Sequence, residues 1–377
     1  MVGARLAGMA GAATAVADDG TAVWTNPAGL AREPRMDAEL LGSFLVSNRN
    51  DFLGTIDEVS SLDLSGIVSR GDLPALAAAV EDLQRLAQKG TGVVGSGIGG
   101  LVFGWNGFAV AIDDTAYTGS YPTIDLVHVL PVNDPAVGLA FNQTGISFAG
   151  LEAREARFSY AHPFFAKVLL VGGTLRYVSG RTYYFKQSVF DISSTDPVDL
   201  AREALKHNTT DTSKFTFDLG AMVNILGIAR IGLTSTAINE PKFAVANNPS
   251  DPTLAGAPAT IKLPRTLRAG AAVQPIGALT IAVDYDLKAT DVLIPGGRSQ
   301  QLAAGAEFKF PLFAIRAGAF RDTAAPDAHW AFTGGFGLGL KAVSLNAAVM
   351  LSTESGLSLS STNRRDVGAG VDARIRF

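Results

Sequence analysis

The chain has 377 residues, of which 47% are hydrophobic and 18% are charged, and its mean hydropathy is +0.23. This composition is apolar for a soluble protein, yet Gly, Asp, Arg and Ser interrupt every apolar run before it reaches the ~20 residues of a membrane-spanning helix. The net charge of −4 argues against nucleic acid as a partner. The absence of cysteine excludes disulfides, thiol catalysis and thiolate zinc sites.

Residues 1–31 do not follow a strand pattern. They are rich in Gly and Ala, and turn signals occur at residues 17–20 and 26–29. Small residues suit a segment threaded through a confined lumen. Residues 1–5 lack the basic and apolar regions of a signal peptide, and we expect a mature chain from which a targeting segment has been removed.

From residue 36 onward, apolar and polar residues alternate with the side-chain period of a β-strand. Such segments are predicted at about 36–48, 92–106, 107–119, 148–162, 167–185, 213–225, 228–239, 259–275, 277–291, 299–311, 313–322, 330–342, 343–354 and 365–377. In the last segment, apolar residues from Val367 to Phe377 oppose Asp366, Asp372, Arg374 and other polar or small residues. These polar faces are too charged for a packed core, so the pattern predicts strands between lipid and water.

The connections between these strands alternate between short turns and long loops. Long loops are expected at about 49–91, 120–147, 186–212, 240–258, 292–298, 323–329 and 355–364. Outer-membrane barrels have this asymmetry, with short periplasmic turns and longer external loops, and they close because an open sheet edge in lipid would leave backbone groups unpaired. The sequence therefore predicts an all-β fold, a transmembrane antiparallel β-barrel of about 14 strands (residues 36–377) with an N-terminal plug (residues 1–35) inside the lumen.

Two segments of the long loops have helical patterns. In the first loop, Asp72 is placed as an N-cap and is followed by an apolar stripe that includes Leu76 and Leu83. A shorter segment covers residues 196–205. The helices could gather a hydrophobic ligand, with Leu76 and Leu83 as contacts, or simply cap the barrel, and the sequence leaves both open.

The N-terminal segment contains four short motifs in a fixed order. They are Gly3-Ala4-Arg5, Gly8-Met9-Ala10-Gly11-Ala12, Val16-Ala17-Asp18-Asp19 and Trp24-Thr25-Asn26-Pro27-Ala28-Gly29-Leu30. This run resembles the hatch of FadL-type outer-membrane transporters and their relatives, including PorV-like and TraF-like barrel proteins. Residues 158–163, 171–177, 264–270 and 305–307 resemble later strands of these barrels. The resemblance covers the whole chain and implies a fourteen-stranded barrel plugged by its N-terminus.

The resemblance implies passive uptake of hydrophobic small molecules, such as long-chain fatty acids, across the bacterial outer membrane with lateral release into lipid. Its expected partners are membrane lipid and a hydrophobic ligand or detergent, without a cofactor. A helix in the first loop is not expected of fatty-acid transporters. A second function therefore stays open, in which a non-transporting barrel serves as a platform for secreted or surface proteins.

Many charged residues fall on the inward face of the predicted strands. Most are expected to brace the wall and the plug, because buried charges must be paired. A planar guanidinium is also well suited to receive a ligand carboxylate. The candidates for that role are Arg157, Arg176, Arg230 and Arg268.

Asp113 and Asp114 are neighbours in the third predicted strand, so one of them faces lipid unless the strand bulges or has already left the membrane. In FadL-type proteins a kink in the third strand opens a side exit. The resemblance implies a lateral gate at Asp113 and Asp114, with Asn26 and Pro27 as the latch of the plug. The alternative, a strand that has left the membrane by Asp113, stays open.

Two other motifs do not support an enzyme. Residues 95–100 fit the G-x-G-x-x-G spacing of a dinucleotide site, but they lead into a strand instead of a helix. The histidines, His128, His162, His207 and His329, form no Ser/His/acid arrangement and are too scattered for a metal site. We expect neither catalysis nor a bound metal.

Overall fold

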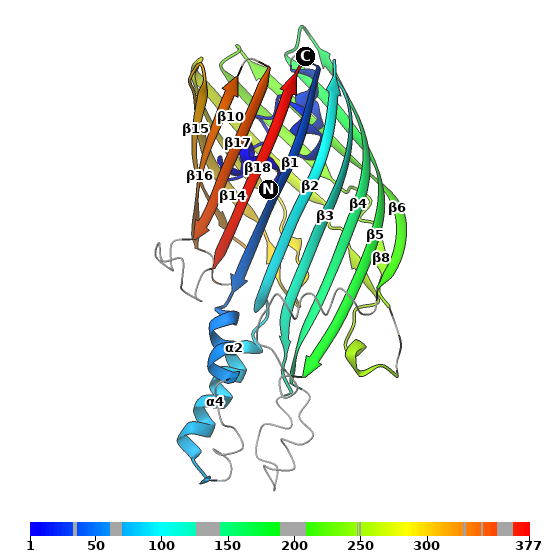
Figure 1. Cartoon of the computed structure of the whole chain (residues 1–377), viewed down its shortest axis with the longest axis vertical. Helices are drawn as coiled ribbons and strands as arrows, with labels where there is room; N and C mark the ends of the chain where they lie inside the picture. Colours follow the sequence, from blue (N-terminus) through cyan, green and yellow to red (C-terminus); the bar gives the residue numbers. More distant parts are fainter. Residues whose placement is uncertain are drawn as a thin grey trace.

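Fourteen antiparallel strands close into a barrel in which each strand pairs with its neighbours along the chain (Figure 1). The computed structural model describes residues 1–32, 36–60, 70–125, 144–188, 209–246, 248, 250–325, 327, 329–340, 342–352 and 365–377. The closed barrel predicted from the alternating pattern is confirmed. Within the described residues, no helix has the length and apolar character needed to cross a membrane.

The wall strands lie close to the predicted segments. They are β1 (Met36–Arg49), β2 (Gly92–Trp105), β3 (Phe108–Thr123), β4 (Gly145–Phe164), β5 (Leu169–Ser188), β6 (Thr210–Ile225), β7 (Ala229–Thr236), β10 (Thr266–Ile276), β11 (Leu279–Asp286), β14 (Gln301–Lys309), β15 (Phe313–Asp322), β16 (Trp330–Leu340), β17 (Val343–Ser352) and β18 (Asp366–Arg376). We call the end of the barrel that carries the tight turns the short-turn end and the other the long-loop end.

Two predicted strands were too long, because part of each segment folds away from the wall. Residues 259–265 and 287–291 continue the alternating pattern, but they belong to two small hairpins. One hairpin pairs β8 (Lys242–Ala244) with β9 (Thr260–Lys262), and the other pairs β12 (Thr290–Asp291) with β13 (Arg298–Ser299). A short 3-10 helix, η3 (Pro252–Leu254), lies in the first hairpin's loop.

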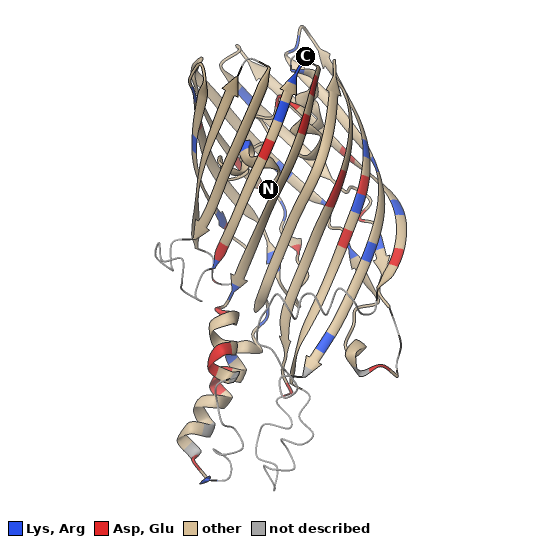
Figure 2. Ribbon diagram, in the orientation of Figure 1, with Lys and Arg blue, Asp and Glu red and all other residues tan. Residues whose placement is uncertain are grey.

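The outer face of the barrel is apolar and the inner face is charged. Leu40, Ile112 and Phe215 point outward and are each more than half exposed. Charged residues are spaced along the strands (Figure 2), and many of them, such as Asp284 and Glu307, are buried inside. This is the arrangement expected of a wall with lipid outside.

The N-terminal segment fills the short-turn half of the lumen and forms the plug (residues 1–32). It contains α1 (Gly3–Ala7) and the 3-10 helices η1 (Gly20–Trp24) and η2 (Pro27–Ala31). Every residue of these three helices is buried. The first helix packs against β16, β17, β18 and β1, and η2 packs against β4, β5 and β6. The plug therefore touches opposite sides of the wall.

Glycines in the wall allow the plug backbone to approach closely. A Cβ atom on Gly305 would collide with the backbone of Met9, and one on Gly220 would collide with the Asn26 side chain. Gly334 instead faces outward on β16, and nothing lies within 4 Å of the place where its Cβ would stand. The glycines at the plug contact are therefore required by space and not by a turn.

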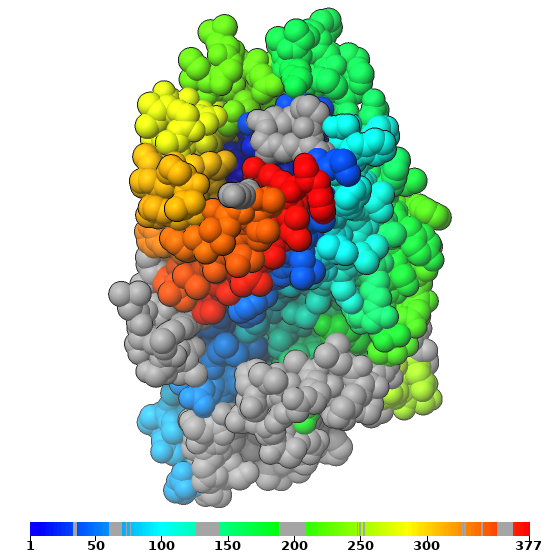
Figure 3. Space-filling model, turned by 45° about the horizontal axis from the view of Figure 1, so that its top comes forward, coloured from blue at the N-terminus to red at the C-terminus, as the bar shows by residue number. Residues whose placement is uncertain are grey.

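Two helices extend beyond the long-loop end (Figures 1 and 3). The helix predicted after Asp72 is confirmed as α4 (Leu73–Leu86), and the Asp72 carboxylate accepts a hydrogen bond from the Ala75 N–H. It packs against α2 (Phe52–Ser60), which the sequence analysis did not predict. The segment 196–205 lies outside the described residues.

A leucine at position 305 should displace the plug, because its side chain would occupy the space of the Met9 backbone. We expect Gly305→Leu to assemble poorly or to expose the plug, whereas Gly334→Leu should behave like the parent. Heat-modifiable gel mobility of the folded barrel and thiol labelling of an added Ala12→Cys would measure this. Equal labelling in the two leucine variants would contradict the packing.

Candidate functional site

Two loops fold into the long-loop half of the barrel and narrow it. Phe243 of the β8–β9 hairpin is fully buried and lies where a side chain at Gly180 of β5 would stand. The Thr182 hydroxyl donates to the carbonyl of Ala244 at 2.6 Å. From the other hairpin, the Leu293 carbonyl lies against Gly119 of β3. The sequence analysis expected external loops here and did not foresee that their apolar residues are buried.

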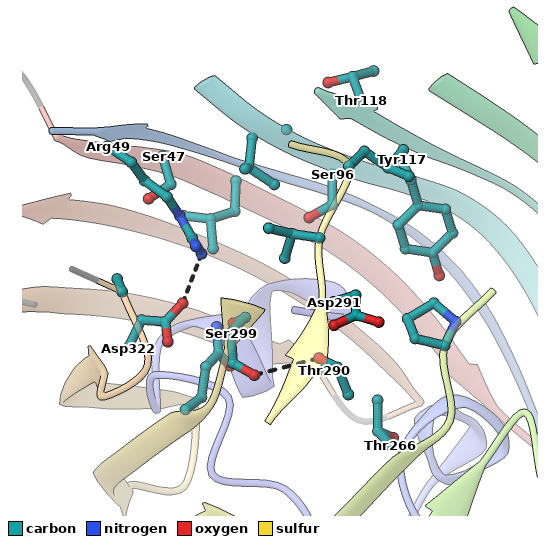
Figure 4. Close-up of a pocket in the computed structure, with 18 of the residues that line it drawn as sticks. Ser47, Arg49, Ser96, Tyr117, Thr118, Thr266, Thr290, Asp291, Ser299 and Asp322 are labelled. Atoms are coloured by element: carbon teal, nitrogen blue, oxygen red, sulfur yellow. Dashed lines mark hydrogen bonds and ion pairs between the residues drawn. The ribbon is translucent and has the colours of Figure 1, made fainter. Parts of the chain in front are cut away.

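A cavity of about 250 Å³ remains between these hairpins and the strands, and we call it the loop-end cavity. Its lining is largely apolar and includes Leu45, Val94, Tyr117, Leu151, Ile261, Leu263, Pro264, Val292, Leu293 and Phe320. Figure 4 shows Tyr117 and Ser96 on one side and Arg49 pointing at Asp322 on the other. The buried Arg49 guanidinium binds Asp322 at 2.7 Å, so this charge is paired.

A second space of about 150 Å³, the mid-barrel cavity, lies next to the plug. Trp24 of the plug lines it together with Arg157, Arg176 and Thr236 of the wall. Ser96 and Tyr117 line both cavities, so these two side chains stand where one cavity meets the other.

The arginines of the mid-barrel cavity belong to a network of buried ion pairs. Arg157 binds Asp113 at 2.6 Å and Glu155 at 2.9 Å. Arg176 binds Glu155 at 2.7 Å and Asp218 at 3.1 Å. These guanidinium groups are occupied by the wall's own carboxylates, which leaves little capacity for a ligand carboxylate.

The remaining predicted ligand contacts are separated from these two cavities. Arg268 pairs with Asp286 at 2.6 Å, and Arg230 donates to the carbonyl of Ala15 in the plug at 2.9 Å. Leu83 of α4 is buried, and the side chain of Leu76 lies outside the described residues. The sequence analysis did not single out the loop-end residues, because their convergence depends on how the hairpins fold.

The bulge expected at Asp113 and Asp114 is absent, and this part of the gate hypothesis is wrong. Strand β3 pairs with β2 and with β4 in unbroken register through both residues. Asp113 points inward, whereas Asp114 points outward and binds Arg154 of β4 at 3.3 Å. Arg154 lies opposite Ser179 of β5, so a polar row crosses the outer face here. The apolar outer face ends at this row, which fits the alternative that the strand has left the membrane by Asp113.

Asp113 and Asn26 join the plug to the wall. The Asp113 carboxylate accepts a hydrogen bond from the Trp24 indole N–H at 2.9 Å. The Asn26 amide donates to the carbonyls of Thr14 and Ala221, at 2.8 and 3.2 Å, and its oxygen caps η2, in which Pro27 is the first residue. Whether this junction moves as a latch stays a prediction.

A larger cavity of about 440 Å³ lies at the other side of the plug, and we call it the short-turn cavity. Its lining is polar and basic. The plug residue Arg5 lies at its wall, where it binds Asp18 at 2.6 Å, Asp19 at 2.7 Å and Glu307 at 3.2 Å. Among the described residues, no group of three or more His, Asp or Glu side chains is placed to hold a metal ion.

His329 lies at the rim of the loop-end cavity and is held by its neighbours. Its Nε2 atom is 2.7 Å from the Asp366 carboxylate, and its Nδ1 atom is 2.9 Å from the Asp327 carbonyl. The hydrogen bond to Asp366 raises the pKa of His329 above its usual value. The charged pair therefore stabilises the rim at low pH, and this contribution is lost as the pH rises through the raised pKa.

The rim should accordingly be more stable at about pH 5.5 than at about pH 9. We expect the thermal unfolding temperature of the barrel in detergent to fall over this interval, and we expect the His329→Gln variant to lose part of that fall. His162→Gln, at the short-turn end, is the control. An unchanged pH dependence in His329→Gln would contradict the assignment.

Comparisons with known proteins place this fold. No curated protein matches the sequence. Three solved structures share the fold over nearly their whole length. The CymD monoaromatic hydrocarbon channel has a TM-score of 0.57 and 12% identity, with 100% of this chain and 97% of that chain covered. The Ralstonia pickettii toluene transporter TbuX has a TM-score of 0.54 and 15% identity, with 100% of this chain and 98% of that chain covered. A deltaS2S3 mutant of the TodX monoaromatic hydrocarbon channel has a TM-score of 0.54 and 13% identity, with 99% of this chain and 97% of that chain covered. These three are channels or transporters rather than enzymes.

A family match confirms the resemblance to TraF-like barrel proteins, and the solved structures confirm the barrel fold. The match covers residues 23–286, which is more than half of the chain. The chain belongs to the family described as "F plasmid transfer operon, TraF, protein".

Proposed function

We propose that this protein is an outer-membrane channel for the passive uptake of hydrophobic small molecules, with its long-loop end outside. The observation that carries the proposal is the apolar loop-end cavity, which meets the mid-barrel cavity at Ser96 and Tyr117. The free energy of an apolar molecule falls when it moves from water into such a site. The names of the solved structures with this fold, hydrocarbon channels and a toluene transporter, support the same class of ligand.

The cavity pair favours uptake over a platform for secreted or surface proteins, because a platform needs no apolar space inside its lumen. The ligand we favour is a long-chain fatty acid or a similar amphiphile. Lys262 at the loop-end cavity is a suitable partner for its head group, since this partly exposed ammonium group lies 3.5 Å from Glu240 and 3.7 Å from Asp291. These long contacts leave donors for a carboxylate.

A tryptophan at position 96 should block the junction of the two cavities. We expect Ser96→Trp to weaken binding of labelled palmitate, and of toluene, by about tenfold or more, which corresponds to ~1.4 kcal/mol. Leu101→Trp, on the outer face of the same strand, should bind like the parent. Fluorescence titration in detergent and uptake into proteoliposomes would measure both.

Three outcomes of that experiment are informative. If the parent binds palmitate and Lys262→Gln binds it more weakly, the ligand is an amphiphile. If the parent binds toluene but not palmitate, the ligand is restricted to uncharged hydrocarbons. If the parent binds neither compound at micromolar concentrations, the uptake proposal fails.

Lateral release into lipid is part of the proposal, because the plug closes the axial route and an apolar ligand gains nothing from water beyond it. The unbroken pairing of β3 moves the exit elsewhere, and the seam between β6 and β7 fits better. Strand β6 pairs with β5 from Thr210 to Val223 but with β7 only from Leu219 to Ile225. Thr236, which ends β7, lines the mid-barrel cavity.

A disulfide across this seam should slow release. Leu219 and Ser235 are register partners at its end, so Leu219→Cys with Ser235→Cys can form one in this cysteine-free chain. We expect oxidation to reduce ligand transfer into lipid and reduction to restore it. The control is the Ala156→Cys, Tyr177→Cys pair between β4 and β5. Equal transfer by the oxidised and reduced forms of the seam variant would exclude this exit.

A further inference from the structure

The short-turn cavity has an excess of positive charge. Seven Arg and Lys side chains line it, together with a single carboxylate of the described residues, Asp18. They come from the plug and from four wall strands on different sides of the space, and include Arg5, Arg32, Arg230, Lys309, Arg316 and Arg374.

The carboxylates behind this lining are shared among several cations. Glu307 binds Arg5, Arg316 and Lys309, at 3.2, 2.7 and 3.1 Å. Asp19 binds Arg5 and Arg374, at 2.7 and 2.6 Å, and Asp18 binds Arg5 and Arg32, at 2.6 and 3.2 Å. Three carboxylates therefore serve five cations, while Asp372 and Glu39 add negative charge near Arg316 and Arg374.

Arg230 makes the imbalance sharper, because it is buried and has no carboxylate partner among the described residues. Only 6% of its surface is exposed, and its Nε donates to the carbonyl of Ala15. The charges that act on it are the repulsive Arg32 and Arg5 and the attractive Asp18. A buried guanidinium without a counterion is costly, so an anion supplied from outside would be strongly favoured here.

We propose that the short-turn cavity is an anion site that binds a phosphate group, with Arg230 as its central ligand. The cations surround the space from several elements, and a tetrahedral group with oxygens in several directions matches this arrangement better than a planar carboxylate, which one guanidinium satisfies. A cavity of about 440 Å³ has room for such a group and bridging water.

The phosphate could belong to a free solute or to the head group of a lipid. The cavity is also lined by Phe310, Leu312 and Leu338, which are exposed apolar residues at the short-turn rim. A lipid in the adjoining leaflet could therefore place its head group in the cavity while its chains remain outside. Because the plug separates this cavity from the loop-end cavity, the site does not depend on the proposed uptake function.

The test titrates inorganic phosphate into the purified full-length barrel in a phosphate-free neutral detergent at constant ionic strength. We expect saturable binding by the parent, and a loss of about tenfold or more in affinity for Arg230→Gln, since a hydrogen bond to a charged group is removed. Arg181→Gln is the control, because this outward guanidinium pairs with Asp211 far from the cavity. Arg230→Lys should retain part of the affinity.

A second arm distinguishes the two sources. Native mass spectrometry of protein released from nanodiscs of phosphatidylglycerol and phosphatidylcholine would detect a retained lipid. Retention of phosphatidylglycerol by the parent and Arg181→Gln but not by Arg230→Gln, without binding of inorganic phosphate, assigns the site to a head group. Binding of inorganic phosphate by the parent without retention of phosphatidylglycerol assigns the site to a free solute.

The proposal is overturned if the parent binds neither, or if Arg230→Gln binds as the parent does. Should Arg230→Gln fail to fold, Arg32→Gln supplies the same comparison. Palmitate binding by Arg230→Gln should equal that of the parent, so loss of phosphate binding and failure of the uptake proposal are separate results.

Discussion

The structure depends on hydrogen bonds between buried carboxylates of the wall and the backbone of the plug. Asp372 accepts the N–H groups of Ala4 and Arg5, and Asp284 accepts those of Ala13 and Thr14. The first N–H groups of a short helix or turn have no partner within it, and a buried carboxylate is costly unless it is hydrogen-bonded. Each group therefore satisfies the other, and these hydrogen bonds position the plug in addition to its apolar contacts with the wall.

This anchoring divides the lumen into two compartments of different chemistry. On the long-loop side, the hairpins bring apolar residues such as Phe243 and Leu263 into the barrel and leave an apolar cavity. On the short-turn side, Arg5 and its partners make a polar, cationic space. Under the proposed function, a hydrophobic molecule would favour the first compartment over the second, and the plug would separate the two.

The sequence predicted the barrel well because the signals of its wall are local. Alternation with period two is visible within the length of a single strand, and the exchange of short turns and long loops follows once the strands are marked. The helix after Asp72 was predicted for the same reason, from its cap and its stripe. The two strands that were drawn too long show the limit, since Thr260 and Thr290 continue the pattern while belonging to hairpins that leave the wall.

The site was predicted less well because it is made by contacts between distant segments. Arg157 and Arg176 read as free cations in a single strand, but each has a partner on a neighbouring strand. Asp113 of β3 pairs with Arg157, and Asp218 of β6 pairs with Arg176. The loop-end cavity depends on the fit of Phe243 to Gly180, across more than sixty positions of sequence. Neither relation leaves a periodic trace, so only the folded barrel reveals them.

Asp113 illustrates how a correct signal received the wrong interpretation. An acid inside an apolar strand did mark a special position, but the strand is regular and the carboxylate binds the plug. Trp24, which donates to Asp113, also lines the mid-barrel cavity beside Arg157. A ligand in that cavity would therefore contact an indole that anchors the plug. If the ligand binds more tightly when Trp24 is released from Asp113 than when it is anchored, the ligand would shift the plug toward the released position. Occupancy of the cavity would then be linked to opening of the barrel.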